Sequence, residues 1–255
     1  PEKFLLGEVW EDATTKYGFN QRRTYLLGKG LDSVMNYPFK NAVLDFVKGK
    51  PAEQAANEIL TICEHYPAPA MDTALNFLST HDTERALTVI ADEPANGRGR
   101  EWQSGRCVTG DAYEEGLLKL KMAYAIIYTL PGVPCLYYGD EIGMQGYRDP
   151  FNRAFYRWDT HEERLRPVLA QLAALRHSCE AFTTGELSIL RAEGGVLHYQ
   201  RVGNFETAEV IVNRTEHIIV EPLASGKHTE VNPMGFTIVV EEVGHNPNHS
   251  YYDYI

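Results

Sequence analysis

The sequence predicts an α/β protein that changes to all-β structure towards its C-terminal end, and two observations carry this prediction. Through about residue 178, short apolar runs alternate with helical patterns, which is typical of βα units on a parallel sheet. From about residue 181, β-type runs follow one another closely with turn residues between them, which indicates a small antiparallel sandwich. We therefore expect an α/β domain over residues 1–180 and an antiparallel β-sandwich domain over residues 181–255.

Each element follows from a local pattern. Strands of the parallel sheet are expected at residues 4–9, 33–35, 75–78 and 133–138. Apolar residues at helical spacing predict helices at about residues 39–46, 52–63, 113–130 and 165–175. The clearest strands of the β-rich part are residues 196–199, 210–212, 218–220 and 236–240. The polar, tyrosine-rich tail at residues 244–255 is assigned no structure.

Composition narrows the classes of partner. The formal net charge of −11, with no local basic patch, argues against nucleic acid and anionic membranes. The same acidity fits a neutral polyhydroxyl ligand, although it is more simply explained as a solubility feature. No apolar run approaches the roughly 20 residues of a membrane span. The four cysteines form no Cys-x-x-Cys or Cys/His cluster, so neither a metal nor another cofactor is expected. The start of the chain lacks a secretory signal pattern, which favours the cytoplasm but leaves the location open.

Polar residues gather where the predicted parallel strands end, and Glu8 belongs to the first such cluster. In a βα barrel the active site is built at that rim, because the loops after the strands converge there. A carboxylic acid beside the indole of Trp10 can sit in a drier environment, which suits a proton donor. The alternative is an acidic loop that leads into a helix.

A second cluster contains His81 and Asp82, directly after the strand at residues 75–78. Asp82 could equally be the N-cap of a helix that begins at Thr83. A third cluster pairs Asp149 with Arg153, which could be a local ion pair that holds a loop.

Together these segments resemble the α-amylase family of glycoside hydrolases, and neopullulanases, cyclomaltodextrinases and maltogenic amylases in particular. The resemblance rests on four motifs in the order of the family's fifth to eighth barrel strands: FLLGEVWEDA at residues 4–13, LDSVMNYPF at 31–39, NFLSTHDTER at 76–85 and PGVPCLYYGDE at 131–141. One departure is Glu11, which stands where many members of that subgroup have histidine.

The resemblance implies a role for each candidate residue in cleaving α-glucan oligosaccharides such as maltodextrin, pullulan or cyclodextrin. Glu8 would be the general acid/base, and Asp82 would stabilise the oxocarbenium-like transition state. His81 would bind the same sugar, and Trp10 would supply an apolar wall beside the acid. Asp149 and Arg153 would bind the neighbouring sugar on the non-reducing side.

The same resemblance implies that the catalytic nucleophile is missing. Retaining glycosidases use a second carboxylate about 5 Å from the acid, and in this family it lies on the fourth strand. Since Glu8 is the eighth residue, that strand has no room, and a full barrel needs about 250 residues. We therefore expect the C-terminal half of a (β/α)8 barrel, strands five to eight, followed by the sandwich. Such a half would need its missing N-terminal half, or would dimerise through its open strand edges, and would be inactive alone.

Two other functions stay open. A non-catalytic carbohydrate-binding protein on a decayed amylase fold is disfavoured, because a binding protein has no need of Glu8 together with His81 and Asp82. A transglycosylase on the same barrel is not distinguished from a hydrolase, because nothing in these motifs separates water from sugar as the acceptor.

Overall fold

Four short parallel strands lie side by side in the computed structural model, which describes residues 3–159 and 162–243. β1 (Leu6–Gly7) pairs with β4 (Ser33–Val34), and β5 (Leu75–Asn76) pairs with β6 (Val133–Pro134). A parallel bridge between Met35 and Leu75 joins the two pairs. The order is therefore β1, β4, β5, β6, as expected of successive βα units, although each strand is only two residues long.

Helices predicted by apolar spacing are confirmed. These are α1 (Tyr37–Lys48), α2 (Ala52–His65), α6 (Gly110–Thr129) and α7 (Arg166–Ser178). The side chain of Asn36 caps α1 by accepting a hydrogen bond from the amide of Phe39, and Gly49 ends the helix at a positive φ of 132°. The structure adds the shorter helices α3 (Ala68–Asp72), α4 (Ala86–Ala91), α5 (Arg100–Ser104) and α8 (Ala181–Thr184) and the 3₁₀ turns η1 (Asp140–Ile142) and η2 (Phe151–Arg153).

The β-rich part contains a four-stranded antiparallel sheet in the order β12-β9-β8-β7. Its strands are β7 (Glu186–Glu193), β8 (Val196–Val202), β9 (Glu206–Asn213) and β12 (Gly235–Glu242). A hairpin of β10 (Ile219–Pro222) and β11 (His228–Val231) packs on this sheet around Ile211, Leu223, Val231 and Val239. Because residues 181–184 are helical, the first strand of this part begins at Glu186.

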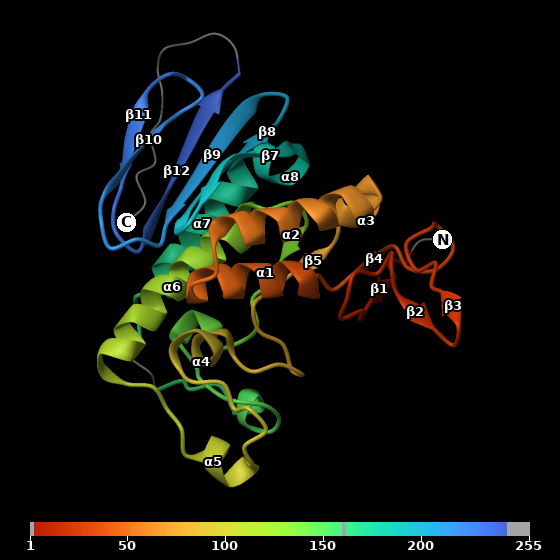
Figure 1. The fold of residues 1–255 in the computed structure, drawn as a ribbon, viewed down its shortest axis with the longest axis vertical. Coiled ribbons are helices and arrows are strands. Elements are labelled where there is room, and N and C mark those ends of the chain that lie inside the picture. Colours follow the sequence, from red (N-terminus) through yellow and green to blue (C-terminus); the bar gives the residue numbers. More distant parts are fainter. Residues whose placement is uncertain (1–2, 160–161, 244–255) are drawn as a thin grey trace.

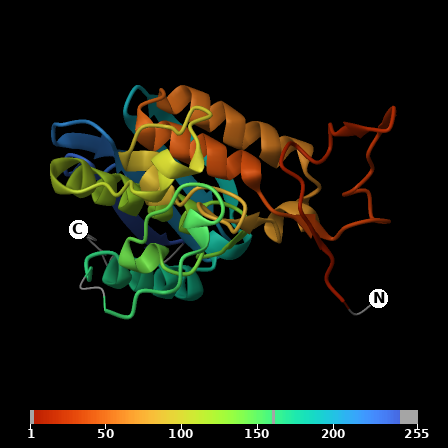
Figure 2. The same cartoon turned by 90° about the horizontal axis from the view of Figure 1, so that it is seen from below.

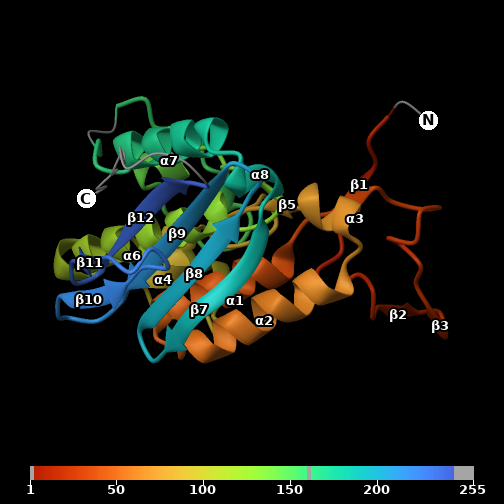
Figure 3. The same cartoon turned by 90° about the horizontal axis from the view of Figure 1, so that it is seen from above.

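One hydrophobic core joins both parts. α6 packs against β9 and β12, and α2 packs against β7 and β8, an arrangement visible in Figures 1 and 3. Buried side chains of the sheet, such as Tyr199 and Phe236, belong to the same cluster as Phe39 of α1. The antiparallel sheet is thus as expected, whereas the half-barrel and sandwich arrangement, with its boundary near residue 180, stays a prediction.

The N-terminal segment is less covered than the rest. It carries β1 and the hairpin of β2 (Tyr17–Gly18) and β3 (Gln21–Arg22), and it extends away from the helices in all three views (Figures 1, 2 and 3). Phe4, Leu5 and Leu6 are exposed, and so is Val133 of β6, at the other end of the strand order. The run at residues 133–138 is therefore not the buried strand that its apolar sequence predicts. The described residues include no helix long and apolar enough to cross a membrane.

Candidate active site

Glu8 directly follows β1, and its side chain is exposed. The phenol of Tyr37, the first residue of α1, donates a hydrogen bond of 3.1 Å to Glu8 Oε1. Trp10 stacks on Tyr37 with the ring centroids 4.3 Å apart, and Phe77 contacts Tyr37 edge-on from the other strand pair. Burial raises the pKa of Tyr37 to about 12, and the hydrogen bond to Glu8 adds to this rise. Tyr37 is therefore a fixed donor to the Glu8 carboxylate at neutral pH.

His81 and Asp82 lie in the loop between β5 and α4, and both are exposed. The imidazole of His81 contacts the carboxylate of Asp82, with His81 Nε2 3.2 Å from Asp82 Oδ2. Asp82 is not the N-cap of the helix, since α4 begins later and its N-cap is Arg85. The hydroxyl of Ser79 instead accepts a hydrogen bond from the amide of Ala86, the first residue of α4. The side chain of Asp82 is therefore not used as a helix cap, and it is exposed.

Residues of η2 hold this loop in place. The side-chain amide of the fully buried Asn152 lies within hydrogen-bond distance of three loop carbonyls, those of Thr80, His81 and Thr83, at 2.8–3.3 Å. Arg153 donates from Nε to the carbonyl of His81 and from Nη2 to Asp82 Oδ1, the latter at 2.9 Å.

Arg153 also forms an ion pair with Asp149, with Arg153 Nε 3.1 Å from Asp149 Oδ1. This is the local ion pair that the sequence predicted as one alternative. The same guanidinium thus links Asp149 with Asp82, which the sequence did not indicate.

A buried ion pair lies where α4 begins. The guanidinium of Arg85, fully buried, lies 3.1 Å from Asp140 Oδ1 and donates to the carbonyl of Tyr138. It also lies over the rings of Tyr137 and Tyr138, 4.8 Å from each centroid. Burial raises the pKa of Asp140, while hydrogen bonds from Ser79 and Tyr124 and the charge of Arg85 oppose that rise.

The structure brings together three of the six predicted site residues most closely. One ligand atom each of Glu8, His81 and Asp82 lies within 4.8 Å of the others. Among the described residues this is the one group that could offer three ligands to a metal ion, and all three side chains are exposed. Two carboxylates and an imidazole at such distances can also exchange protons with a ligand and stabilise positive charge beside it.

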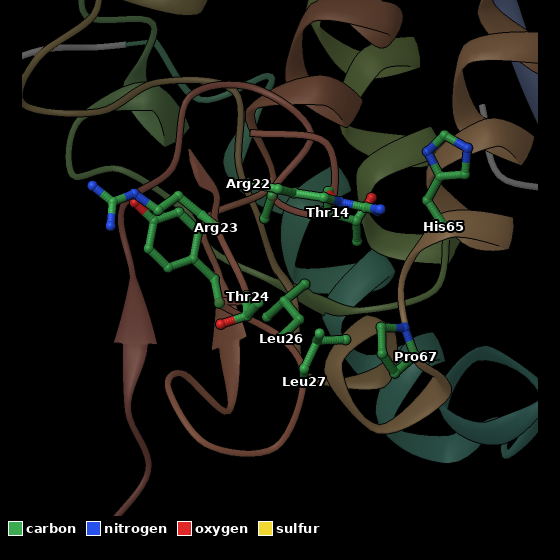
Figure 4. A pocket seen from close by; sticks show the side chains of 10 residues that line it. Thr14, Arg22, Arg23, Thr24, Leu26, Leu27, His65 and Pro67 are labelled. Carbon is green, nitrogen blue, oxygen red and sulfur yellow. The ribbon is translucent and has the colours of Figure 1, made fainter. Parts of the chain in front are cut away.

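A cavity of about 570 Å³ beside Pro38 includes Trp10 in its lining, and two further cavities lie near this region. A cavity of about 350 Å³ borders it directly, because Trp10 and Asp82 are among its lining residues. A second, of about 290 Å³, lies between the segment at residues 13–27 and the C-terminal end of α2, where Pro67 lies beside Leu27 (Figure 4). None of the six predicted site residues lines that second cavity.

Sequence reasoning gave no role to Tyr37, Asn152 or Arg85. Tyr37 and Arg85 stand inside quoted motifs, and Asn152 stands between Asp149 and Arg153, yet their contacts are with segments far away in the chain. No local pattern sets Asn152 apart from the charged residues around it, so its burial could not be foreseen.

Comparison with known proteins gives a consistent result. The family model described as "Alpha amylase, catalytic domain" matches residues 1–181. A cyclomaltodextrinase of Geobacillus thermopakistaniensis is 32% identical over 88% of this chain and 34% of its own length. An amylopullulanase of Thermoanaerobacter thermohydrosulfuricus is 31% identical over 79% of this chain and 13% of its own length.

Solved structures agree on the fold. A cyclic α-maltosyl-(1→6)-maltose hydrolase of Arthrobacter globiformis superimposes with a TM-score of 0.77 at 24% identity, over 94% of this chain and 49% of that protein. A cyclomaltodextrinase superimposes with a TM-score of 0.68 at 31% identity, over 86% of this chain and 34% of that protein. The chain spans about a third of the length of the cyclomaltodextrinases that it matches.

Proposed function

Because the chain belongs to the α-amylase family of glycoside hydrolases, we propose that it supplies part of the active site of a retaining enzyme that cleaves α-glucosidic bonds. Its substrates would be maltodextrin, pullulan or cyclodextrin, in line with the names of its relatives. The observation that carries this proposal is the convergence of Glu8, His81 and Asp82 from the ends of two different parallel strands.

In the proposed mechanism Glu8 protonates the glycosidic oxygen and later takes a proton from the attacking water. Its hydrogen bond from Tyr37 fixes the orientation of the carboxylate. Asp82 stabilises the oxocarbenium-like transition state, and His81 binds the same sugar. Asp149 and Arg153 bind the neighbouring sugar.

A retaining mechanism also needs a carboxylate nucleophile, and Asp82 is the predicted site residue whose carboxylate lies close to Glu8. One carboxylate oxygen of Asp82 lies within 4.8 Å of one of Glu8, which does not exceed the roughly 5 Å that retaining enzymes use, so that on distance alone Asp82 is a candidate. Its carboxylate is however paired with Arg153 at 2.9 Å and with His81 at 3.2 Å, and these contacts lower its reactivity as a nucleophile. We therefore assign the nucleophile to a carboxylate outside residues 1–255 and expect the chain alone to be inactive.

The open edge supports the same proposal. Apolar side chains of the N-terminal segment, Phe4, Leu5 and Leu6, are exposed beside Glu8, and the described part of the chain offers β1 no second neighbour beside β4. The rest of a barrel would cover them. A homodimer through these edges is the alternative, and light scattering of the purified chain distinguishes a monomer from a dimer.

A direct test uses a chromogenic maltooligosaccharide. The purified chain should release no chromophore, whereas addition of the N-terminal part of a full-length relative should restore turnover that Glu8→Gln abolishes. Turnover by the chain alone that disappears in Asp82→Asn and returns with added azide would instead identify Asp82 as the nucleophile. The ratio of transfer to hydrolysis, measured with maltose as acceptor, separates a transglycosylase from a hydrolase.

A further inference from the structure

Lys40 is a buried cation to which the mechanism gives no role. It lies in the second turn of α1, and only 7% of it is exposed. Within residues 3–159 and 162–243, its ammonium makes no hydrogen bond and no salt bridge. Burial lowers the pKa of Lys40 to about 8, against the opposing charges of Glu84 and Asp45. Lys40 Nζ is not among the fully buried polar atoms that lack a partner, so its stem is buried while its ammonium reaches open space.

The ammonium has an open space beside it. Lys40 lines the cavity of about 350 Å³ that borders the site, together with Trp10, Asp82, Thr83, Glu84, Val89 and Arg148. That volume is within the range of small-molecule sites. The indole of Trp10, 47% exposed, offers an apolar surface, as sugar rings require.

The charges around this space select a neutral ligand. Two cations, Lys40 and Arg148, are balanced by two carboxylates, Asp82 and Glu84. Glu84 and Arg148 also lie 3.7 Å apart and partly neutralise each other. The three N–H donors of the Lys40 ammonium therefore remain available, and the oxygen atoms of sugar hydroxyl groups can accept hydrogen bonds from them.

We propose that this cavity is a subsite for one glucosyl unit adjoining the cleavage point, and that Lys40 determines its specificity by donating hydrogen bonds to the sugar hydroxyl oxygens. The proposal rests on the proposed function, because it takes the ligand to be an α-glucan. It adds a sugar contact on α1, away from the three strand-end segments, after β1, β5 and β6, that carry the other candidate residues.

Competitive labelling tests the contact and the function separately. Amines of the 255-residue chain are acetylated with limiting acetic anhydride, and histidines with diethyl pyrocarbonate, with and without maltotriose, followed by peptide mass spectrometry. We expect maltotriose to protect both Lys40 and His81, and to leave Lys48, exposed on the same helix, unprotected. Protection of His81 without Lys40 overturns the subsite and leaves the function standing. Protection of neither overturns the proposed function, and the subsite with it.

Variants then separate a binding role from a structural one. The Kd for maltotriose, measured by titration calorimetry, should rise by about tenfold in Lys40→Met, and should stay within about twofold in the matched control Lys48→Met and in Lys40→Arg. Lys40→Met should unfold at the same or a higher urea concentration than the wild type, since it removes a buried charge. A clear loss of stability with unchanged Kd would show that Lys40 is structural and would overturn the proposal.

The pH profile is a second readout. Charged groups near Lys40 are Glu84, Asp45 and Lys48, with Asp82 and Arg148 across the cavity. Because the pKa of Lys40 is about 8, maltotriose affinity of the wild type should fall between pH 7 and about pH 9.5 as the ammonium loses its proton. Carboxylates and guanidinium groups ordinarily titrate outside that interval. The fall should persist in Lys48→Met and vanish in Lys40→Met; a fall that remains in Lys40→Met contradicts the proposal.

Discussion

The two sides of the candidate active site are held very differently. The loop with His81 and Asp82 is fixed by the buried Asn152, by Arg153 and, where α4 begins, by the Arg85–Asp140 ion pair. Glu8 is held by one hydrogen bond from Tyr37 and directly follows a strand whose apolar side chain is exposed. The chain thus completes one side of the site from its own residues. On the other side the proposed general acid/base, Glu8, has little support from the described residues, which is what a site shared with a further segment would require.

The largest change in stability is expected for the ion pair beneath the loop that carries His81 and Asp82. Asp140→Asn leaves the guanidinium of Arg85 buried with no opposite charge, which should lower the free energy of unfolding by about 4 kcal/mol. Urea denaturation followed by circular dichroism measures this. Glu8→Gln, on the exposed side, is the comparison and should change stability little. Equal effects of the two variants would remove the contrast on which this comparison rests.

A somewhat smaller effect is expected for Asn152→Ala. The change removes the donors that face the carbonyls of Thr80, His81 and Thr83; the carbonyl of His81 keeps its bond from Arg153, but those of Thr80 and Thr83 lose this buried partner. The free energy of unfolding should fall by about 3 kcal/mol. Asn57→Ala, an exposed position on α2, is the matched control and should stay within about 0.5 kcal/mol of the wild type. A loss of similar size in both variants would assign the effect to asparagine in general rather than to the loop contact.

The smallest effect concerns the weakly held side. Tyr37→Phe removes one hydrogen bond to an exposed carboxylate and should cost no more than about 1 kcal/mol. The phenol itself can be followed by its ultraviolet absorbance. Because burial raises the pKa of Tyr37 in the folded protein to about 12, above the value of about 10 in an unfolded chain, the folded state retains the proton more strongly. The corresponding stability should be fully present below pH 10 and lost between about pH 10 and pH 12, and this loss should be absent in Tyr37→Phe.

Much of the fold followed from patterns that span only a few residues. Apolar residues at helical spacing predicted α1, α2, α6 and α7. Short apolar runs that end in polar clusters predicted the four parallel strands in their order along the chain. Patterning failed where the decisive partners lie elsewhere. The strand β7 alternates weakly and was missed, although it pairs along nearly its whole length with β8. Residues 133–138 look like a buried strand, but Val133 is exposed because the described chain places nothing over it.

For the site, the sequence by itself determined which groups could do chemistry. Glu8, His81 and Asp82 follow strand ends, and the ends of parallel strands lie on one edge, so that their proximity was predictable from chain order alone. Tertiary structure alone decided what supports them, since Tyr37, Asn152 and Arg85 act across 29, 69 and 55 residues of chain respectively. The same holds for Lys40, whose burial beside a cavity depends on how α1 packs on α4. Local sequence fixes the backbone through short-range sterics and hydrogen bonds, whereas burial and long-range contacts exist only once distant segments have packed together.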